Sequence, residues 1–335
     1  MAPENATKAI VYHEYGSPDV LELREVDKPV VNDDEVLVRV HAASVNSWDW
    51  DLLTGTFQGR LGAFRTPKYT ILGADIAGRV EAAGRNVEQY QPGNEVFGDV
   101  SGCGWGGFAE YVSVPESALA PKSDSLTFAE AAAAPQAAVL ALQGLRDKGQ
   151  LQPGQSVLIN GAGGGVGTFA VQIAKSFGAE VTGVDSTRKL DMLRSIGADQ
   201  VIDYTQEDFT KNGRHYDLIL DVAASRSIFD YRRALRPGCI YVMVGGSTAT
   251  ILQTVFLGPF VSMIGSKKTG ILIHKPNQKD LLYLNELLET GKVVPVIDRR
   301  YPLSEVARAF HRFGEGHVKG KLSSLCEAHA IAQAT

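Results

Sequence analysis

Residues 161–167, GAGGGVG, place five glycines in seven positions and lead into a stretch, 168–177, that we expect to be helical. Glycine weakens a helix start, so this density indicates that the backbone must approach another group closely. An apolar run typical of a buried strand, 156–160, precedes the glycines. A strand, a glycine turn and a helix N-terminus together offer N–H donors and a favourable dipole to a pyrophosphate. The pattern therefore predicts a dinucleotide site.

The fingerprint positions of such a turn fall on Ala162, Gly164 and Gly167. A second glycine pair, Gly245 and Gly246, lies at the C-terminal end of the fifth predicted strand, where such sheets bind ligands, and we expect the nicotinamide end there. The alternative is a glycine-rich connector without a ligand. The turn residues predicted to bind cofactor are Gly163, Gly164, Gly165, Val166 and Gly167.

The choice of nucleotide depends on the residues after the next predicted strand, 180–185. Asp185, 18 positions after Gly167, could accept the ribose hydroxyls of NAD. It would repel a 2′-phosphate by about 4 kcal/mol per unit charge at about 4 Å and an effective dielectric of about 20. Nearby donors and cations instead suit that phosphate, although a helix N-cap with solvated charges is an equal alternative. We expect NADPH, with NAD possible because of Asp185; the phosphate-binding candidates are Ser186, Arg188, Lys189 and Tyr204.

Composition narrows the class of protein. The net charge of -5 argues against a nucleic-acid partner, which would require a basic face. The three cysteines, Cys103, Cys239 and Cys326, are too far apart in sequence for a disulfide framework or a C-x-x-C metal knuckle. The first 16 residues lack the apolar core of a secretory signal. We expect a cytoplasmic protein that binds neither nucleic acid nor a membrane.

One apolar stretch, 250–265, is shorter than the roughly 20 residues that span a bilayer and contains Gly258 and Pro259. We expect a buried helix broken at that pair, in preference to membrane contact. Such a helix could also line an apolar substrate pocket or a subunit interface.

The chain of 335 residues is longer than a single core usually supports, which favours two domains. Up to about residue 122, short alternating runs between turns predict an antiparallel, barrel-like β domain. From about 125, strands and helices alternate, which predicts an α/β, doubly wound parallel sheet. The predicted limits are 1–124, 125–275 and a C-terminal segment, 276–335, that returns to the first domain. The strands expected in the parallel sheet are 156–160, 180–185, 200–204, 218–222, 240–245 and 269–273.

At this point the chain resembles the medium-chain dehydrogenase/reductase superfamily, in its zinc-independent quinone oxidoreductase branch of zeta-crystallin-like and enoyl reductase-like proteins. The resemblance implies a GroES-like β-barrel domain built from both ends of the chain, an inserted Rossmann domain and usually a dimer, so we expect a homodimer. It rests on AASVNSWDW (42–50), ILGADIAGRV (71–80), GNEVFG (93–98), GGFAEYV (106–112), APQAAVLALQGL (134–145), GAGGGVG (161–167), RSIGADQVIDY (194–204) and HVKGKL (317–322).

The metal ligands of zinc-bearing relatives are missing. Those relatives carry a cysteine at the position of Asn46 and Gly-His-Glu where this chain has Gly73, Ala74 and Asp75. Without thiolate or imidazole at these places a tetrahedral zinc site cannot be assembled, so we expect no metal. Hydride transfer from NADPH to a quinone or to the C=C bond of an enone suits such a site, because conjugation already activates the acceptor.

The protein must then supply orientation and a donor for the developing enolate oxygen. Asn46 is our candidate for that donor or for positioning the nicotinamide ribose; the alternative is an amide that ties a turn. Trp48 and Trp50 could form an apolar wall for the substrate, with one of them in the barrel core. Asp75 also lies on the substrate side, where we favour a structural role over catalysis. The family's usual threonine beside the nicotinamide is replaced by Leu140.

Two other functions stay open. An NAD(P)-dependent alcohol dehydrogenase or carbonyl reductase would need a catalytic acid that the sequence does not reveal. An NADPH-binding protein without turnover would need only the glycine turn. No residue is identified as the general acid, which leaves water as the proton source.

Overall fold

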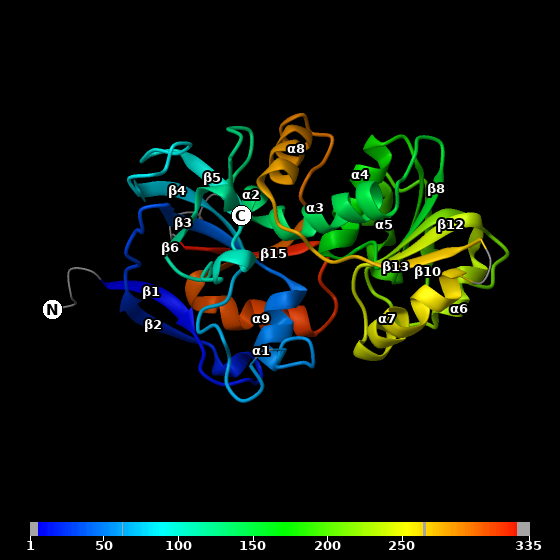
Figure 1. Ribbon diagram of the computed structural model, residues 1–335, viewed down its shortest axis with the longest axis horizontal. Helices are drawn as coiled ribbons and strands as arrows, with labels where there is room; N and C mark the ends of the chain where they lie inside the picture. The colour runs from blue at the N-terminus through cyan, green and yellow to red at the C-terminus, as the bar shows by residue number, and fades with distance from the viewer. Residues whose placement is uncertain (1–5, 62, 264–265, 327–335) are drawn as a thin grey trace. The chain divides into compact units, whose positions relative to one another are not determined.

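Figure 1 shows the computed structural model, which describes residues 6–61, 63–263 and 266–326. Contacts divide the chain into two compact units. Unit 1 combines Met1–Gln136, Pro276–Thr290 and Ile297–Thr335, and unit 2 combines Ala137–Lys275 and Gly291–Val296. Our sequence limits put the first boundary at 124, whereas the contacts put it at Gln136. The reason is that α2 (Phe128–Ala133) packs on strands of unit 1.

Strand β3 (Glu35–Val45) is the central strand of unit 1. It pairs antiparallel with β4 (Asp75–Ala83), β6 (Tyr111–Pro115) and β15 (Lys321–Leu325). The β15 pairing brings the C-terminal part of the chain into the N-terminal sheet, as the family resemblance implies. The remaining strands of the unit are β1 (Ala6–Val11), β2 (Glu22–Asp27), β5 (Glu95–Asp99), β7 (Leu119–Pro121) and β14 (Ile297–Pro302).

The helices of unit 1 begin and end at identifiable signals. α1 (Ser47–Thr54) follows β3 directly, has Asn46 as its N-cap and ends at Gly55, whose φ of 64° is the left-handed value that favours glycine. α2 begins with a capping box between Thr127 and Glu130. The other helices of this unit are α8 (Gln278–Glu289) and α9 (Val306–Gly314).

Unit 2 contains a parallel sheet with the strand order β10-β9-β8-β11-β12-β13, which confirms the predicted doubly wound fold. Its central strand β8 is buried on both faces, as its apolar run predicted. Helices α4 and α7 cover opposite faces of the sheet (Figure 1). The strands are β8 (Ser156–Asn160), β9 (Glu180–Asp185), β10 (Gln200–Asp203), β11 (Tyr216–Asp221), β12 (Leu235–Met243) and β13 (Lys268–Ile271). The helices are α4 (Gly165–Ser176), α5 (Leu190–Ser195), α6 (Ile228–Arg233) and α7 (Thr248–Met263), with α3 (Pro135–Leu142) running across the boundary into a π-helical turn at Gln143–Lys148.

The strand order reverses between β8 and β11. Crossovers to β9 and β10 go one way from β8, and crossovers to β12 and β13 go the other way from β11. Ligands of such sheets bind at this switch point, outside the carboxyl ends of the strands. The glycine turn follows β8 there.

Helix α7 differs from our expectation: it is continuous through Pro259 and it is not buried. Pro259 has no N–H to donate to the carbonyl of Val255, four residues earlier in the helix. Val255 is exposed, so its carbonyl can bond water instead. The buried stripe of the helix is narrow and consists of Thr250, Thr254 and Gly258. The large apolar side chains point outward instead: Leu252, Val255, Phe256, Leu257, Phe260 and Met263. Residues 264 and 265 of the stretch lie outside the described residues.

Across residues 6–61, 63–263 and 266–326, no helix combines the length and the apolar character needed to cross a membrane.

Candidate functional site

The glycine turn joins β8 to α4, which begins at Gly165, three residues earlier than predicted. A Cβ atom on Gly167 would lie 2.2 Å from the carbonyl oxygen of Gly161, so the turn and the helix are too close for any side chain. A Cβ on Gly164, the N-cap, would meet only that same oxygen, at 3.5 Å. Gly167 is therefore required by packing, whereas Gly164 is not crowded by other protein atoms and precedes the N-terminus of α4, the kind of helix end that binds a pyrophosphate.

Asp185 is bonded within unit 2. Its Oδ2 accepts from the backbone N–H of Gly163 at 2.8 Å, and its Oδ1 accepts from that of Ser186 at 2.8 Å. The ammonium of Lys189 lies 3.6 Å from Oδ1, and both side chains are buried. The negative charge of Asp185 is thus compensated locally, which reduces its repulsion of a nearby phosphate.

The other predicted nucleotide contacts gather at the same strand ends. The backbone N–H of Tyr204 donates to the carbonyl of Asp185 at 3.2 Å, which places Tyr204 beside that strand end. The side chains of Tyr204 and Arg188 are exposed and available to a ligand.

Of the glycine pair Gly245 and Gly246, packing alone explains why Gly246 is a glycine. A Cβ on Gly246 would lie 2.5 Å from the carbonyl oxygen of Ala224, with which Gly246 forms a parallel bridge. A Cβ on Gly245 would lie 3.1 Å from the carbonyl oxygen of Val222, a tight contact that a small shift could relieve. Their contact with the nicotinamide stays a prediction.

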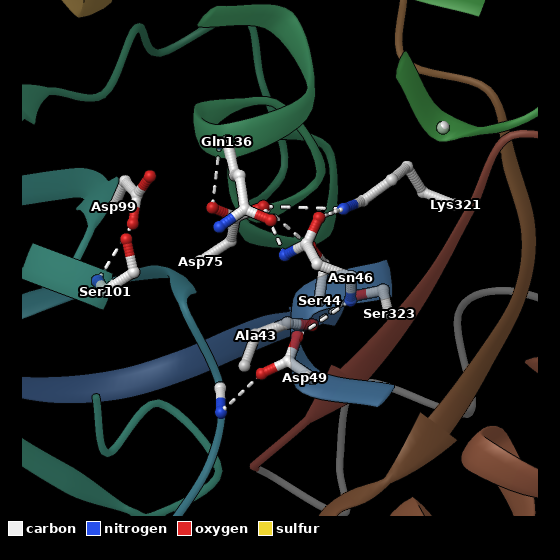
Figure 2. Close-up of polar contacts among 12 residues, drawn as sticks. Ala43, Ser44, Asn46, Asp49, Asp75, Asp99, Ser101, Gln136, Lys321 and Ser323 are labelled. Atoms are coloured by element: carbon white, nitrogen blue, oxygen red, sulfur yellow. Dashed lines mark hydrogen bonds and ion pairs between the residues drawn. The ribbon is translucent and has the colours of Figure 1, made fainter. Parts of the chain in front are cut away.

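Unit 1 contains a buried polar group that we name the Asn46 cluster: Asn46, Asp75 and Lys321 (Figure 2). Asn46 Nδ2 donates to Asp75 Oδ2 at 3.0 Å. Lys321 Nζ donates to Asn46 Oδ1 and lies 3.4 Å from Asp75 Oδ2. The three side chains come from the N-cap of α1 and the first residues of β4 and β15, and strand pairing with β3 brings them together. Their residues are only 6%, 0% and 3% exposed.

Further donors complete the surroundings of Asp75. Ser44 Oγ donates to Oδ2 at 3.1 Å, and the backbone N–H of Gln136 donates to Oδ1 at 2.8 Å. Burial raises the pKa of Asp75, and the ammonium of Lys321 opposes that rise. The side-chain Nε2 of Gln136 is buried and has no partner among the described residues. Neither Lys321 nor Gln136 stands out in the sequence as a site residue. The one local sign of Lys321 is that it opens a short strand, KLSSL, whose five residues are all buried.

Asp49 fixes α1 to the turn before β4. Its Oδ2 accepts from the backbone N–H of Asn46 at 2.8 Å, and its Oδ1 accepts from that of Gly73 at 2.9 Å. Complete burial raises the pKa of Asp49 to about 7. Asp49 therefore sets the position of Asn46 relative to the segment that leads to Asp75.

The two predicted substrate-binding tryptophans lie in different environments. Trp50 packs on Phe313, with ring centroids 5.9 Å apart, and against Gly314, where a Cβ would lie 2.4 Å from its ring. Trp48 is 43% exposed and meets the buried Trp105 edge-on at 5.8 Å. Trp105 has a φ of 68°, an uncommon value for an aromatic residue. Trp48 is thus the tryptophan open to a ligand.

With this geometry in place, comparisons define the class of protein. Residues 32–124 match the alcohol dehydrogenase GroES-like domain family and residues 196–322 the zinc-binding dehydrogenase family. The chain is 37% identical over 329 residues to 2-methylene-furan-3-one reductase of Solanum lycopersicum, covering 94% of this chain and 78% of that one. It is 34% identical to the chloroplastic NADPH-dependent alkenal/one oxidoreductase of Arabidopsis thaliana, with 94% and 78% covered.

Comparison with a solved structure supports the same class of protein. The quinone oxidoreductase from Coxiella burnetii superposes with a TM-score of 0.87 at 29% identity, covering 96% of this chain and 100% of that one. The chain therefore belongs to the medium-chain dehydrogenase/reductase superfamily. It is an oxidoreductase whose relatives use a nicotinamide cofactor, and the glycine turn fits that group.

The name of the second family includes zinc. In the part of the chain that the structure describes, no three His, Cys, Asp or Glu side chains gather as a metal site. At the positions where the family resemblance places zinc ligands, this chain carries Asn46 and Ala74.

Proposed function

We propose that this protein reduces quinones or the activated C=C bond of α,β-unsaturated carbonyls with NADPH. The observation that carries the proposal is the Asn46 cluster, in which a buried amide, at the position where metal-bearing relatives carry a cysteine, is held by a cation and a carboxylate. Relatives whose names specify an enone reductase, an alkenal/one oxidoreductase and a quinone oxidoreductase support the substrate class.

Different groups of the chain bind the nucleotide and the substrate oxygen. The N-terminus of α4 and the open space at Gly164 hold the pyrophosphate of the nucleotide. When bound, the nicotinamide supplies the hydride. Asn46 donates a hydrogen bond to the acceptor oxygen as negative charge develops on it. The proton that completes the reduction comes from water.

The preference for NADPH is supported by the surroundings of Asp185. Lys189, Gly163 and Ser186 together satisfy its carboxylate, so a 2′-phosphate meets little uncompensated negative charge. Arg188 is exposed nearby and supplies a cation for it.

A homodimer joined through unit 2 is part of the same proposal. Strand β13 has β12 as its only strand partner among the described residues, which leaves one edge open. The outward apolar side chains of α7 form a patch of the kind that marks an interaction site, and α7 packs on β13. A second copy of this chain could cover both.

The experiment is NADPH oxidation by chelator-treated protein with a panel of 1,4-quinones and enones, beside alcohols with NADP⁺. We expect turnover with quinones or enones that added zinc does not increase. Gly164→Ala is the matched control, because it fills the nucleotide space without a clash. Alcohol oxidation that disappears with chelator and returns with zinc would instead support an alcohol dehydrogenase. NADPH binding without turnover on any acceptor would support a non-catalytic protein.

A further inference from the structure

The Asn46 cluster allows a single orientation of the Asn46 amide. An ammonium group only donates hydrogen bonds, and a carboxylate only accepts them. Lys321 therefore faces the amide oxygen and Asp75 faces the amide nitrogen, as Figure 2 shows. Turning the amide over would place NH₂ against the ammonium and oxygen against the carboxylate. Both hydrogen bonds would be lost, and two repulsive contacts would replace them.

This orientation leaves one donor over. The amide nitrogen of Asn46 carries two hydrogens, and Asp75 accepts one of them. No other described residue accepts from that nitrogen. The second N–H is therefore without an acceptor among the described residues.

Lys321 also changes the strength of that donor. A cation bonded to the oxygen of an amide withdraws electron density from it and makes its N–H groups better donors. The effect is largest where water is excluded, and Lys321 and Asp75 are both buried.

We propose that Lys321 is a positioning residue that orients and polarises the Asn46 amide, so that its second N–H is presented to the oxygen of the substrate. The inference rests on the proposed function and deepens it. The competing role is purely structural, a buried ion pair that fastens β15 to β4.

The charges around Lys321 determine how its role should depend on pH. The acidic groups that act on it are Asp75, Asp49 and Asp99, and they favour its charged form. Burial acts against them and lowers the pKa of Lys321 below its usual value near 10.5. Polarisation should therefore be lost on the alkaline side, as the ammonium loses its proton.

The chain offers a matched control. Lys122 is likewise buried in unit 1 and forms an ion pair with Glu95 at 2.9 Å, outside the Asn46 cluster. Lys122→Met and Lys321→Met each remove one buried ammonium. A structural role predicts that both variants lose stability and keep their kinetics.

The test compares these variants with the native protein. For Lys321→Met we expect kcat to fall about 10 to 100-fold, as for other residues that orient a reacting group. The affinity for NADPH should be unchanged, and the alkaline decline of kcat present in native protein and Lys122→Met should be absent. Unchanged kcat with the same alkaline decline would overturn the proposal.

A measurement without substrate keeps the inference separate from the proposed function. With ¹⁵N-asparagine labelling, the Asn46 side-chain signals are those that disappear in Asn46→Ser. In native protein we expect these signals downfield of the chemical shifts of a free asparagine amide. In Lys321→Met they should return toward the free-amide values, whereas in Lys122→Met they should stay as in native protein. Unshifted signals in Lys321→Met would exclude the orienting role, even if no acceptor is ever reduced.

Discussion

The ammonium of Lys321 donates to the side-chain oxygen of Asn46 across a separation of 275 residues. With Asp75 of β4, three distant segments meet in one buried contact. The amide at the start of α1 is thereby held by side chains and not only by its own backbone.

Two glycines of one turn should respond differently to the same methyl group. Gly167→Ala should lower the free energy of unfolding by about 1–3 kcal/mol, because its Cβ would overlap the Gly161 carbonyl. Gly164→Ala should change it by less than about 1 kcal/mol, yet weaken NADPH binding about tenfold or more. Thermal unfolding and a fluorescence titration with NADPH measure the two effects. Normal NADPH affinity in Gly164→Ala would move the nucleotide away from this turn.

Removing Lys189 should alter the choice between nucleotides. In Lys189→Ala the carboxylate of Asp185 loses its cation, so we expect the affinity for NADPH to fall about tenfold more than that for NADH. Adding Asp185→Ala should recover part of the loss. The dissociation constants of both nucleotides are measured for each variant. Equal losses for the two nucleotides would contradict a phosphate site here.

Asp49 should make the protein less stable as pH rises. Its pKa is about 7 in the folded protein and near 3.8 when unfolded, so the folded state retains a proton that the unfolded chain releases. The free energy of unfolding should decline between pH 4 and 7, with a contribution on the order of 4 kcal/mol. Asp49→Asn should flatten that decline. Urea unfolding at several pH values tests it, and parallel profiles would show that Asp49 is charged throughout.

Substitution of Trp50 should affect stability, whereas substitution of Trp48 should affect substrate binding. Trp50→Ala should destabilise unit 1 by about 3 kcal/mol, because the ring fills space beside Phe313 and Gly314. Trp48→Ala should leave the unfolding transition nearly unchanged and raise the KM for aromatic acceptors several-fold. Steady-state kinetics and thermal unfolding decide. An unaltered KM would remove Trp48 from the substrate site.

The outward side chains of α7 should hold two copies together. Phe256→Ser combined with Phe260→Ser should convert a dimer into a monomer, because both rings are exposed on the free chain. Val30→Ser, which changes an exposed apolar residue of unit 1, is the control. Light scattering after size exclusion gives the mass. A dimer that survives the double change, or a native protein that is monomeric, would contradict this interface.

Local signals made the parallel sheet predictable. The strand before the glycine turn and the strand that ends at Asp185 lie where their apolar runs indicated, because buried parallel strands and helix starts leave short-range patterns. The burial of α7 could not be predicted in that way, because it depends on what packs against the helix. Lys321 was missed for a related reason. Its partners are close in space but distant in sequence, and the spacing of residues along the chain does not reveal such a contact.

The pairing of β15 with β3 also affects the order in which the chain can fold during synthesis. All six strands of the parallel sheet are synthesised before residue 276, whereas residues 42–45 of β3 cannot pair until residues 322–325 have been synthesised. Until then that edge is unpaired, and open strand edges recruit foreign chains. The nascent chain thus completes the strands of its parallel sheet first and the pairing of β15 with β3 last, so a chaperone would matter most in the interval before β15 is made.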